Sequence, residues 1–466
     1  MSGTALMTAV VAVTVAFRGG FSSAGRSAFV VGAGVALALA AVRDEGGVWR
    51  ALAAPPIALL GVLGGLAALS AAWTIGEPVE AIEAGLVVLA AAALAAAAAV
   101  LCRDTEGARR AMAGLAVVAG ISALAGLVGV VLREQPLAER IDGSWRPGGP
   151  FEYPPALALL QVSVLPALLT GMVGRQRRLS FAAAGGACAA AAVVALSGSR
   201  LQTFLALALL AVAVAWSPSL LGVSHLRAFA AAGLLLATGV AAEIALGGYS
   251  PPGVTRGASG RGLELAAIMG TGLVAWWLWS RTVGQRDSRA GRERPRRAPP
   301  VAVSPAKVVA LLAVSLASMA TVVLADGSTG DRSYSVAHGR IALWSDAVDA
   351  ARARPFAGAG SETFLVATQA NQDAPATRFA HSLPLESAAE LGLLGAALVL
   401  ALYVACATGV AGCRDVELLW LLGPAVLAFL MANLFDWEWH FAGSVAVFAI
   451  CLGPLLAWRL RATSRR

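Results

Sequence analysis

Residues 82–132 read IEAGLVVLAAAALAAAAAVLCRDTEGARRAMAGLAVVAGISALAGLVGVVL, and this stretch decides the fold. Two apolar runs, 82–101 and 111–132, flank a short break that contains Arg103, Arg109 and Arg110. A helix that crosses a hydrocarbon core about 30 Å thick needs roughly 20 apolar residues. Both runs have about that length, so the stretch predicts two membrane-spanning helices joined by a basic turn outside the lipid.

The same pattern recurs along the whole chain of 466 residues, of which 58% are hydrophobic and only 13% charged. This composition excludes a set of soluble domains. We therefore predict an all-α, polytopic membrane protein with about 12 to 14 transmembrane helices. The predicted crossings are 4–17, 28–42, 51–72, 82–101, 111–132, 154–174, 180–197, 201–216, 228–246, 262–280, 306–325, 385–408, 416–435 and 441–458.

The arginines indicate how the chain is oriented in the membrane, because cytoplasmic loops collect positive charge. Counting the crossings from a cytoplasmic N-terminus places all strongly basic breaks on one side, which predicts that both termini are cytoplasmic. The segment 281–304 is rich in Arg and Pro, and we expect a disordered cytoplasmic linker there. Membrane topology thus accounts for the net charge of +8, and no nucleic-acid partner is expected.

The cysteines predict neither a metal site nor a disulfide framework. All five lie in or beside apolar stretches, and none forms a CxxC motif.

The breaks on the opposite, outer side are 133–153, 197–200, 247–261 and 326–384. The last is far longer than most loops of compact proteins, which indicates a functional segment. From His338 it carries a helical pattern with an apolar stripe of Ile341, Trp344, Val348 and Ala351, which suits a helix on the membrane surface.

Four side chains on the predicted outer face are candidates for chemistry. Arg146, Arg200 and Arg340 are fixed cations, and the planar guanidinium group suits phosphate oxygens. His381 lies at the edge of the next crossing, and an imidazole can accept a proton from a hydroxyl near neutral pH. A pyrophosphate-linked lipid would fit this combination of three cations and a base.

Several segments resemble the O-antigen ligase and O-antigen polymerase family of bacterial envelope glycosyltransferases. They are SGSR ending at Arg200, GRIALWSDAVDAARARPFAGAGSETF from Gly339, AHSLPLESAAELGLLG from Ala380 and RPGGPFEYPPALA from Arg146. The resemblance covers roughly residues 140–410. It divides the chain into N-terminal transmembrane helices (1–139), a catalytic region (140–410) and C-terminal transmembrane helices with a basic tail (411–466), and it implies a GT-C-like fold.

The resemblance implies a specific reaction at the outer face of the bacterial inner membrane. The arginines matching Arg200 and Arg340 hold the pyrophosphate of an undecaprenyl-linked glycan donor, and the histidine matching His381 activates the hydroxyl of a lipid-linked or saccharide acceptor. Transfer inverts the anomeric centre and needs neither metal nor cofactor. Two departures concern the acceptor contacts: Ser382 stands where Asn is expected, and the linker between the two arginines is long.

Two other functions remain open. A polymerase of the same family would use the same arginines and histidine, whereas a transporter or flippase would use the arginines to line a passage for an anionic lipid or polysaccharide. The roles of His338, Glu386, Asp436 and His440 are also open. Asp436 and His440 are four residues apart and can pair, and Glu386 can either orient the His381 imidazole or favour the start of its helix.

Overall fold

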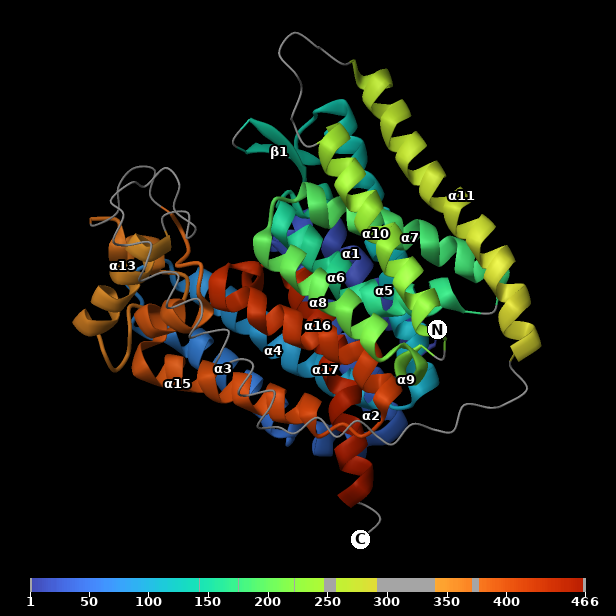
Figure 1. Cartoon of the computed structure of the whole chain (residues 1–466). Helices are drawn as coiled ribbons and strands as arrows, with labels where there is room; N and C mark the ends of the chain where they lie inside the picture. The colour runs from blue at the N-terminus through green and yellow to red at the C-terminus, as the bar shows by residue number, and fades with distance from the viewer. Residues whose placement is uncertain are drawn as a thin grey trace. The chain divides into compact units, whose positions relative to one another are not determined.

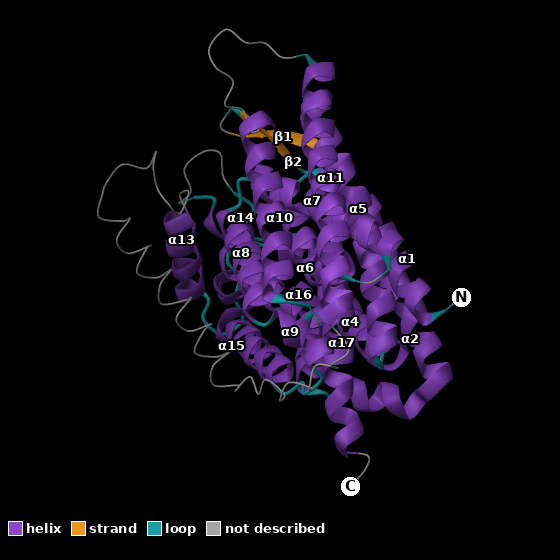
Figure 2. Cartoon of the chain, turned by 45° about the vertical axis from the view of Figure 1, so that its right-hand side comes forward, coloured by secondary structure: helices purple, strands orange, loops and turns teal. Residues whose placement is uncertain are grey.

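The structure, a computed structural model, describes residues 2–463 except 142, 175, 222, 247–256, 291–339 and 371–376. Within these residues the chain is helical almost throughout, apart from one hairpin of two short strands (Figure 2). Nine of the described helices are long and apolar enough to cross a membrane, and three shorter apolar helices accompany them. The protein is therefore an all-α, polytopic membrane protein, as predicted.

The predicted crossings coincide with helices wherever the structure describes the chain. The crossing predicted at 262–280 lies within helix α11, Ala258–Ala290, but α11 is not among the nine helices, so its passage through the membrane stays a prediction. The crossing predicted at 306–325 and His338 both lie outside the described residues.

The chain divides into two compact units that do not follow sequence order. The first unit comprises Met1–Gly25, Asp104–Val301 and Asp415–Ala428. In it α6 packs against α5 and α7, and α7 packs against α10 (Figure 1). Its elements are α1 (Gly3–Ala16), α5 (Thr105–Leu132), β1 (Ala138–Ile141), β2 (Ser144–Pro147), α6 (Pro154–Val173), α7 (Arg177–Leu196), α8 (Arg200–Ala215), α9 (Ser217–Leu220), α10 (His225–Leu246) and α11.

The second unit comprises Arg26–Arg103, Ala302–Arg414 and Phe429–Arg466. In it α4 packs against α3 and α17, and α15 packs against α3 and α13 (Figure 1). Its helices are α2 (Ser23–Leu52, from Arg26 on), α3 (Pro55–Leu69), α4 (Pro78–Leu101), α13 (Arg340–Ala353), α14 (Phe364–Thr368), α15 (Leu383–Ala411) and α17 (Ala442–Thr463). Helix α16 (Val416–Phe435) runs from the first unit into the second.

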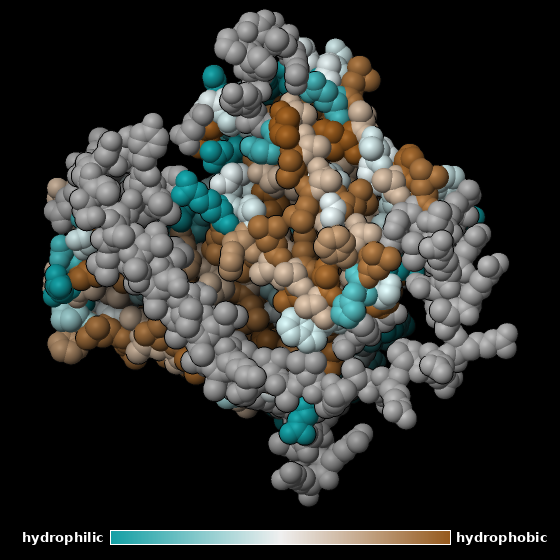
Figure 3. All heavy atoms as spheres, viewed as in Figure 1, coloured by the Kyte–Doolittle hydropathy of each residue, from teal (hydrophilic) through white to brown (hydrophobic). Residues whose placement is uncertain are grey.

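Helix α5 shows how the surface suits lipid. Val117, Ile121 and Leu124 are 61%, 65% and 62% exposed, and their spacing places them on one side of the helix. Large apolar side chains exposed in this pattern would be costly in water. Broad hydrophobic areas are also visible on the face shown in Figure 3.

One expectation for the loops needs correction. The segment 281–304 was expected to be disordered, but its first part, up to Ala290, is the end of helix α11, where no proline interrupts the chain before Pro295. Residues 291–304 lie outside the described residues. In α13 the side that packs against α15 lies next to the predicted apolar stripe, because Leu343, Ala347 and Ala350 pack with Ala389 of α15. Small alanine side chains let two helices approach closely, and that contact sets the buried side of α13. The position of the stripe on the membrane surface stays a prediction.

Candidate active site

His381 lies two residues before α15, next to the N-cap Ser382, where the polar stretch of the long loop meets the helix. Its backbone is in the left-handed region with φ +52°, which is unusual for a residue other than glycine. Its Nδ1 atom lies 2.9 Å from Oδ1 of Asp436, and its side chain is 19% exposed. The imidazole is thus held by a carboxylate while part of it stays accessible.

Asp436 joins His381 to Arg340. Its Oδ2 atom accepts a hydrogen bond from Nη2 of Arg340 at 3.2 Å, and its Oδ1 atom also accepts the backbone N–H of Trp437 at 3.1 Å. Asp436 is only 7% exposed, whereas Arg340, the first residue of α13, is 24% exposed. The structure therefore brings together two of the residues predicted from the sequence, through a carboxylate that was not predicted in this role. We call Arg340, Asp436 and His381 the His381 centre.

The geometry of the His381 centre fixes what it can do chemically. An ionised carboxylate only accepts hydrogen bonds, so Nδ1 of His381 donates to Asp436, and in the neutral ring the lone pair is then on Nε2. Such an imidazole can take a proton from a hydroxyl group. Arg340 has five N–H donors, more than Asp436 uses, so its guanidinium can also bind phosphate oxygens.

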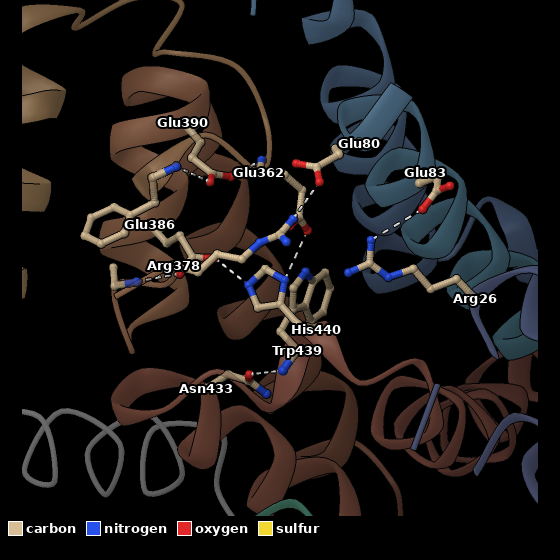
Figure 4. Close-up of polar contacts among 12 residues, drawn as sticks. Arg26, Glu80, Glu83, Glu362, Arg378, Glu386, Glu390, Asn433, Trp439 and His440 are labelled. Atoms are coloured by element: carbon tan, nitrogen blue, oxygen red, sulfur yellow. Dashed lines mark hydrogen bonds and ion pairs between the residues drawn. The ribbon is translucent and has the colours of Figure 1, made fainter. Parts of the chain in front are cut away.

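A second polar cluster surrounds the ring of His440, whose side chain is 7% exposed (Figure 4). Both ring nitrogens of His440 face carboxylates: Nδ1 is 3.1 Å from Glu362 and Nε2 is 2.6 Å from Glu386. Arg378 binds the other oxygen of Glu362 at 3.2 Å and Glu80 of α4 at 3.0 Å. We call these five residues the His440 cluster.

The charges of the His440 cluster shift the pKa values of His440 and Glu362. Burial lowers the pKa of His440, but the charges of Glu386 and Glu362 and their hydrogen bonds outweigh it and raise this pKa to about 10. Burial likewise raises the pKa of Glu362, but the charge and hydrogen bond of His440, with the charges of Arg26 and Arg378, lower it to about 2. The imidazolium and the Glu362 carboxylate therefore stabilise each other's charged forms.

The motif Gly358-Ala359-Gly360 fixes the loop against α15. Helix α15 is interrupted at Gly392, and the carbonyls of Ala389 and Glu390 accept the N–H groups of Ala359 at 3.0 Å and Gly360 at 2.7 Å. At Gly358, with φ +66°, a Cβ atom would lie 2.2 Å from the Glu390 carbonyl oxygen, so only glycine fits there.

The Glu390 side chain of α15 also binds this loop. Its carboxylate accepts the backbone N–H groups of Glu362 at 2.9 Å and Phe364 at 3.0 Å. These bonds place Glu362 in the His440 cluster.

The other two predicted arginines lie in the first unit. Arg146 pairs with Glu139 across the β1–β2 hairpin, and a Cβ atom on Gly198 would lie 2.7 Å from its guanidinium carbon. Burial raises the pKa of Glu139, and the charge of Arg146 opposes this shift. Arg200 begins α8 just after Gly198, and its side chain is exposed. The structure thus brings Arg146 to the turn that carries Arg200, within the first unit.

Sequence reasoning left the partners of His381 and His440 open and missed other residues of the site. Asp436 was considered as a partner for His440, and Glu386 as a partner for His381, but Asp436 binds His381 and Glu386 binds His440. Glu362 and Arg378 were not singled out. An acidic residue just after the glycine motif, in GAGSETF, was the available signal for Glu362. Among the residues that the structure describes, no group of three or more His, Cys, Asp or Glu is arranged to hold a metal ion.

The comparison with known proteins identifies a family for part of the chain. Residues 257–400 match a family model described as O-antigen ligase, which confirms the resemblance seen in the sequence. The match includes Arg340 and His381. No curated protein matches the chain.

Proposed function

We propose that this membrane protein, whose residues 257–400 match the O-antigen ligase family, transfers a glycan from undecaprenyl pyrophosphate to an acceptor hydroxyl at the outer face of the bacterial cytoplasmic membrane. The observation that supports this most is the His381 centre. It combines an imidazole held by a carboxylate with a partly exposed guanidinium, and both lie within the matched residues.

In the proposed reaction, Nε2 of His381 takes the proton of the acceptor hydroxyl as its oxygen attacks the anomeric carbon of the donor sugar. The bond from that carbon to the pyrophosphate oxygen breaks, and the configuration at the carbon is inverted. Asp436 keeps the hydrogen on Nδ1 and stabilises the imidazolium that forms. No metal ion takes part.

Negative charge develops on the pyrophosphate as it leaves. In this proposal Arg340 binds that charge, Arg200 contributes to donor binding as the resemblance implies, and Arg146 is a further cation for the donor. Cations placed where charge grows stabilise the transition state more than the ground state, which is how binding becomes catalysis.

The test uses purified protein in liposomes with a carrier-linked oligosaccharide. Under the ligase proposal, product forms only after an acceptor that carries a free sugar hydroxyl, such as a lipid-linked core glycan, is added. Growth of the oligosaccharide on its carrier without that acceptor would identify a polymerase instead. If neither reaction occurs although the labelled donor binds, the proposed function is wrong.

A further inference from the structure

In the His440 cluster, the carboxylates of Glu362 and Glu386 are both paired with one cation, His440. A neutral imidazole has only one N–H group, but both ring nitrogens of His440 face carboxylate oxygens within hydrogen-bond distance. Both nitrogens therefore donate, and His440 is an imidazolium. Its side chain is 7% exposed, and those of Glu362 and Glu386 are 4% and 6% exposed. Charges buried this deeply are stable only while they remain paired.

One of these carboxylates also holds the backbone next to His381. While Oε1 of Glu386 binds His440, its Oε2 atom accepts the N–H of Ala380 at 2.8 Å. Ala380 is fully buried and directly precedes His381, whose φ of +52° is a conformation that surrounding contacts must maintain. The bond from Glu386 to Ala380 is such a contact.

The segment before His381 is held by the same imidazole in two further ways. Arg378 binds the second oxygen of Glu362, whose first oxygen binds His440. The Phe379 ring lies against the His440 ring, with 4.0 Å between centroids, and stacks on Trp437 at 4.7 Å. Residues 378–380 therefore contact His440 directly or through one carboxylate each.

The same short turn serves both polar groups. Asp436, which binds the His381 ring, and His440 lie at its two ends, between α16 and α17. One end of the turn thus fixes the imidazole of His381, and the other end fixes the peptide that leads to it.

From this arrangement we infer that His440 is a positioning residue for His381: as a buried imidazolium it binds Glu386 and Glu362, and through Glu386 it fixes the backbone that presents His381 to the acceptor. The inference rests on the proposed function, because it assigns His440 a part in that reaction. His440 itself touches no substrate in this account.

The test compares His440→Gln with wild type in the liposome transfer assay. Glutamine keeps a donor but not the charge, so the Glu386 carboxylate loses its counter-charge and the peptide at Ala380 shifts. A displacement of about 1 Å can lower a rate about 100-fold. We expect kcat, counted per donor-binding site, to fall by about 10- to 100-fold with the donor KM unchanged. A merely structural role would lower the number of donor-binding sites and leave kcat per site unchanged.

Glu386→Gln provides a second variant, should His440→Gln not fold. It removes one of the two charges that His440 binds, and we expect the same loss in kcat without a change in KM. His225→Gln is the matched control, since His225 begins α10 in the first unit, and it should keep both constants. A folded His440→Gln or Glu386→Gln protein with wild-type kcat per site would overturn the inference.

The same assay separates this inference from the proposed function. Transfer by His381→Ala at the wild-type rate would overturn the proposed function, whatever His440 does. Loss of transfer in His381→Ala together with full activity in His440→Gln would overturn only the role of His440.

Discussion

At the scale of single residues, the carboxylate of Asp436 that binds His381 is the feature that most supports the proposed role of the histidine. The sequence pointed to His381 and Arg340 because a base and a cation are recognisable by type. It did not point to Asp436 as their common partner, because Asp436 lies 55 residues beyond His381 and no periodicity connects them. Asp436 and His440 are close in the sequence. Only the structure shows that Asp436 binds His381 and that His440 binds Glu386.

Asp436→Asn tests whether the carboxylate sets the tautomer of His381. An asparagine amide can donate to Nδ1, which would place the hydrogen on Nε2 and remove the lone pair from the side facing the acceptor. We expect kcat for transfer to fall by about 10²- to 10⁴-fold, with a small change in donor affinity. Asp349→Asn, on the exposed side of α13, is the control and should keep its activity. Equal rates in both variants would contradict the assignment.

The titration of His440 predicts how stability depends on pH. Its pKa is raised from 6.5 to about 10, so its contribution to stability is complete below pH 6.5. Between pH 6.5 and about 10 the unfolded chain loses the proton that the folded chain keeps, and this contribution is lost. We expect the Tm in detergent to fall over this range more steeply for wild type than for His440→Gln. Parallel Tm curves would show that His440 does not titrate in this way.

At the scale of elements, the sequence predicted the apolar helices well and the contacts of the long loop poorly. Runs of about 20 apolar residues are a local signal, so each predicted crossing that the structure describes coincides with a helix. The interruption of α15 at Gly392 has no such signal, since LGLLG reads as a continuous apolar helix. It follows from the loop, whose N–H groups bind the carbonyls of Ala389 and Glu390.

Gly358→Ala tests this attachment. The new methyl group would lie 2.2 Å from the Glu390 carbonyl oxygen, in a backbone conformation that disfavours alanine. We expect the free energy of unfolding to fall by at least about 2 kcal/mol and transfer activity to fall with it. Gly61→Ala in α3, where a Cβ atom would meet nothing within 4 Å, is the control. Equal thermal stability of the two variants would show that the loop does not need this contact.

At the scale of the whole molecule, the arginine distribution predicts which parts of the chain face which side of the membrane. The helices themselves carry no such information, because an apolar segment crosses equally well in either direction. All five native cysteines are buried, which makes the chain suitable for labelling with introduced cysteines.

Gln369→Cys and Arg103→Cys test the orientation. Both positions are exposed, Gln369 at the end of α14 in the long loop and Arg103 in the basic break after α4. In spheroplasts, a maleimide that cannot cross membranes should label the cysteine at 369 and leave the one at 103 unlabelled until the cells are opened. The reverse labelling would place the His381 centre on the cytoplasmic side and exclude an outer-face transferase.

The most direct measurement is donor binding and glycan transfer by His381→Ala in the same liposomes. The substitution removes the proposed base but leaves Arg340 and Asp436 in place. We predict donor binding within about twofold of wild type and a loss of transfer of at least about 100-fold, the scale of general-base catalysis. Transfer by His381→Ala at the wild-type rate would contradict the account.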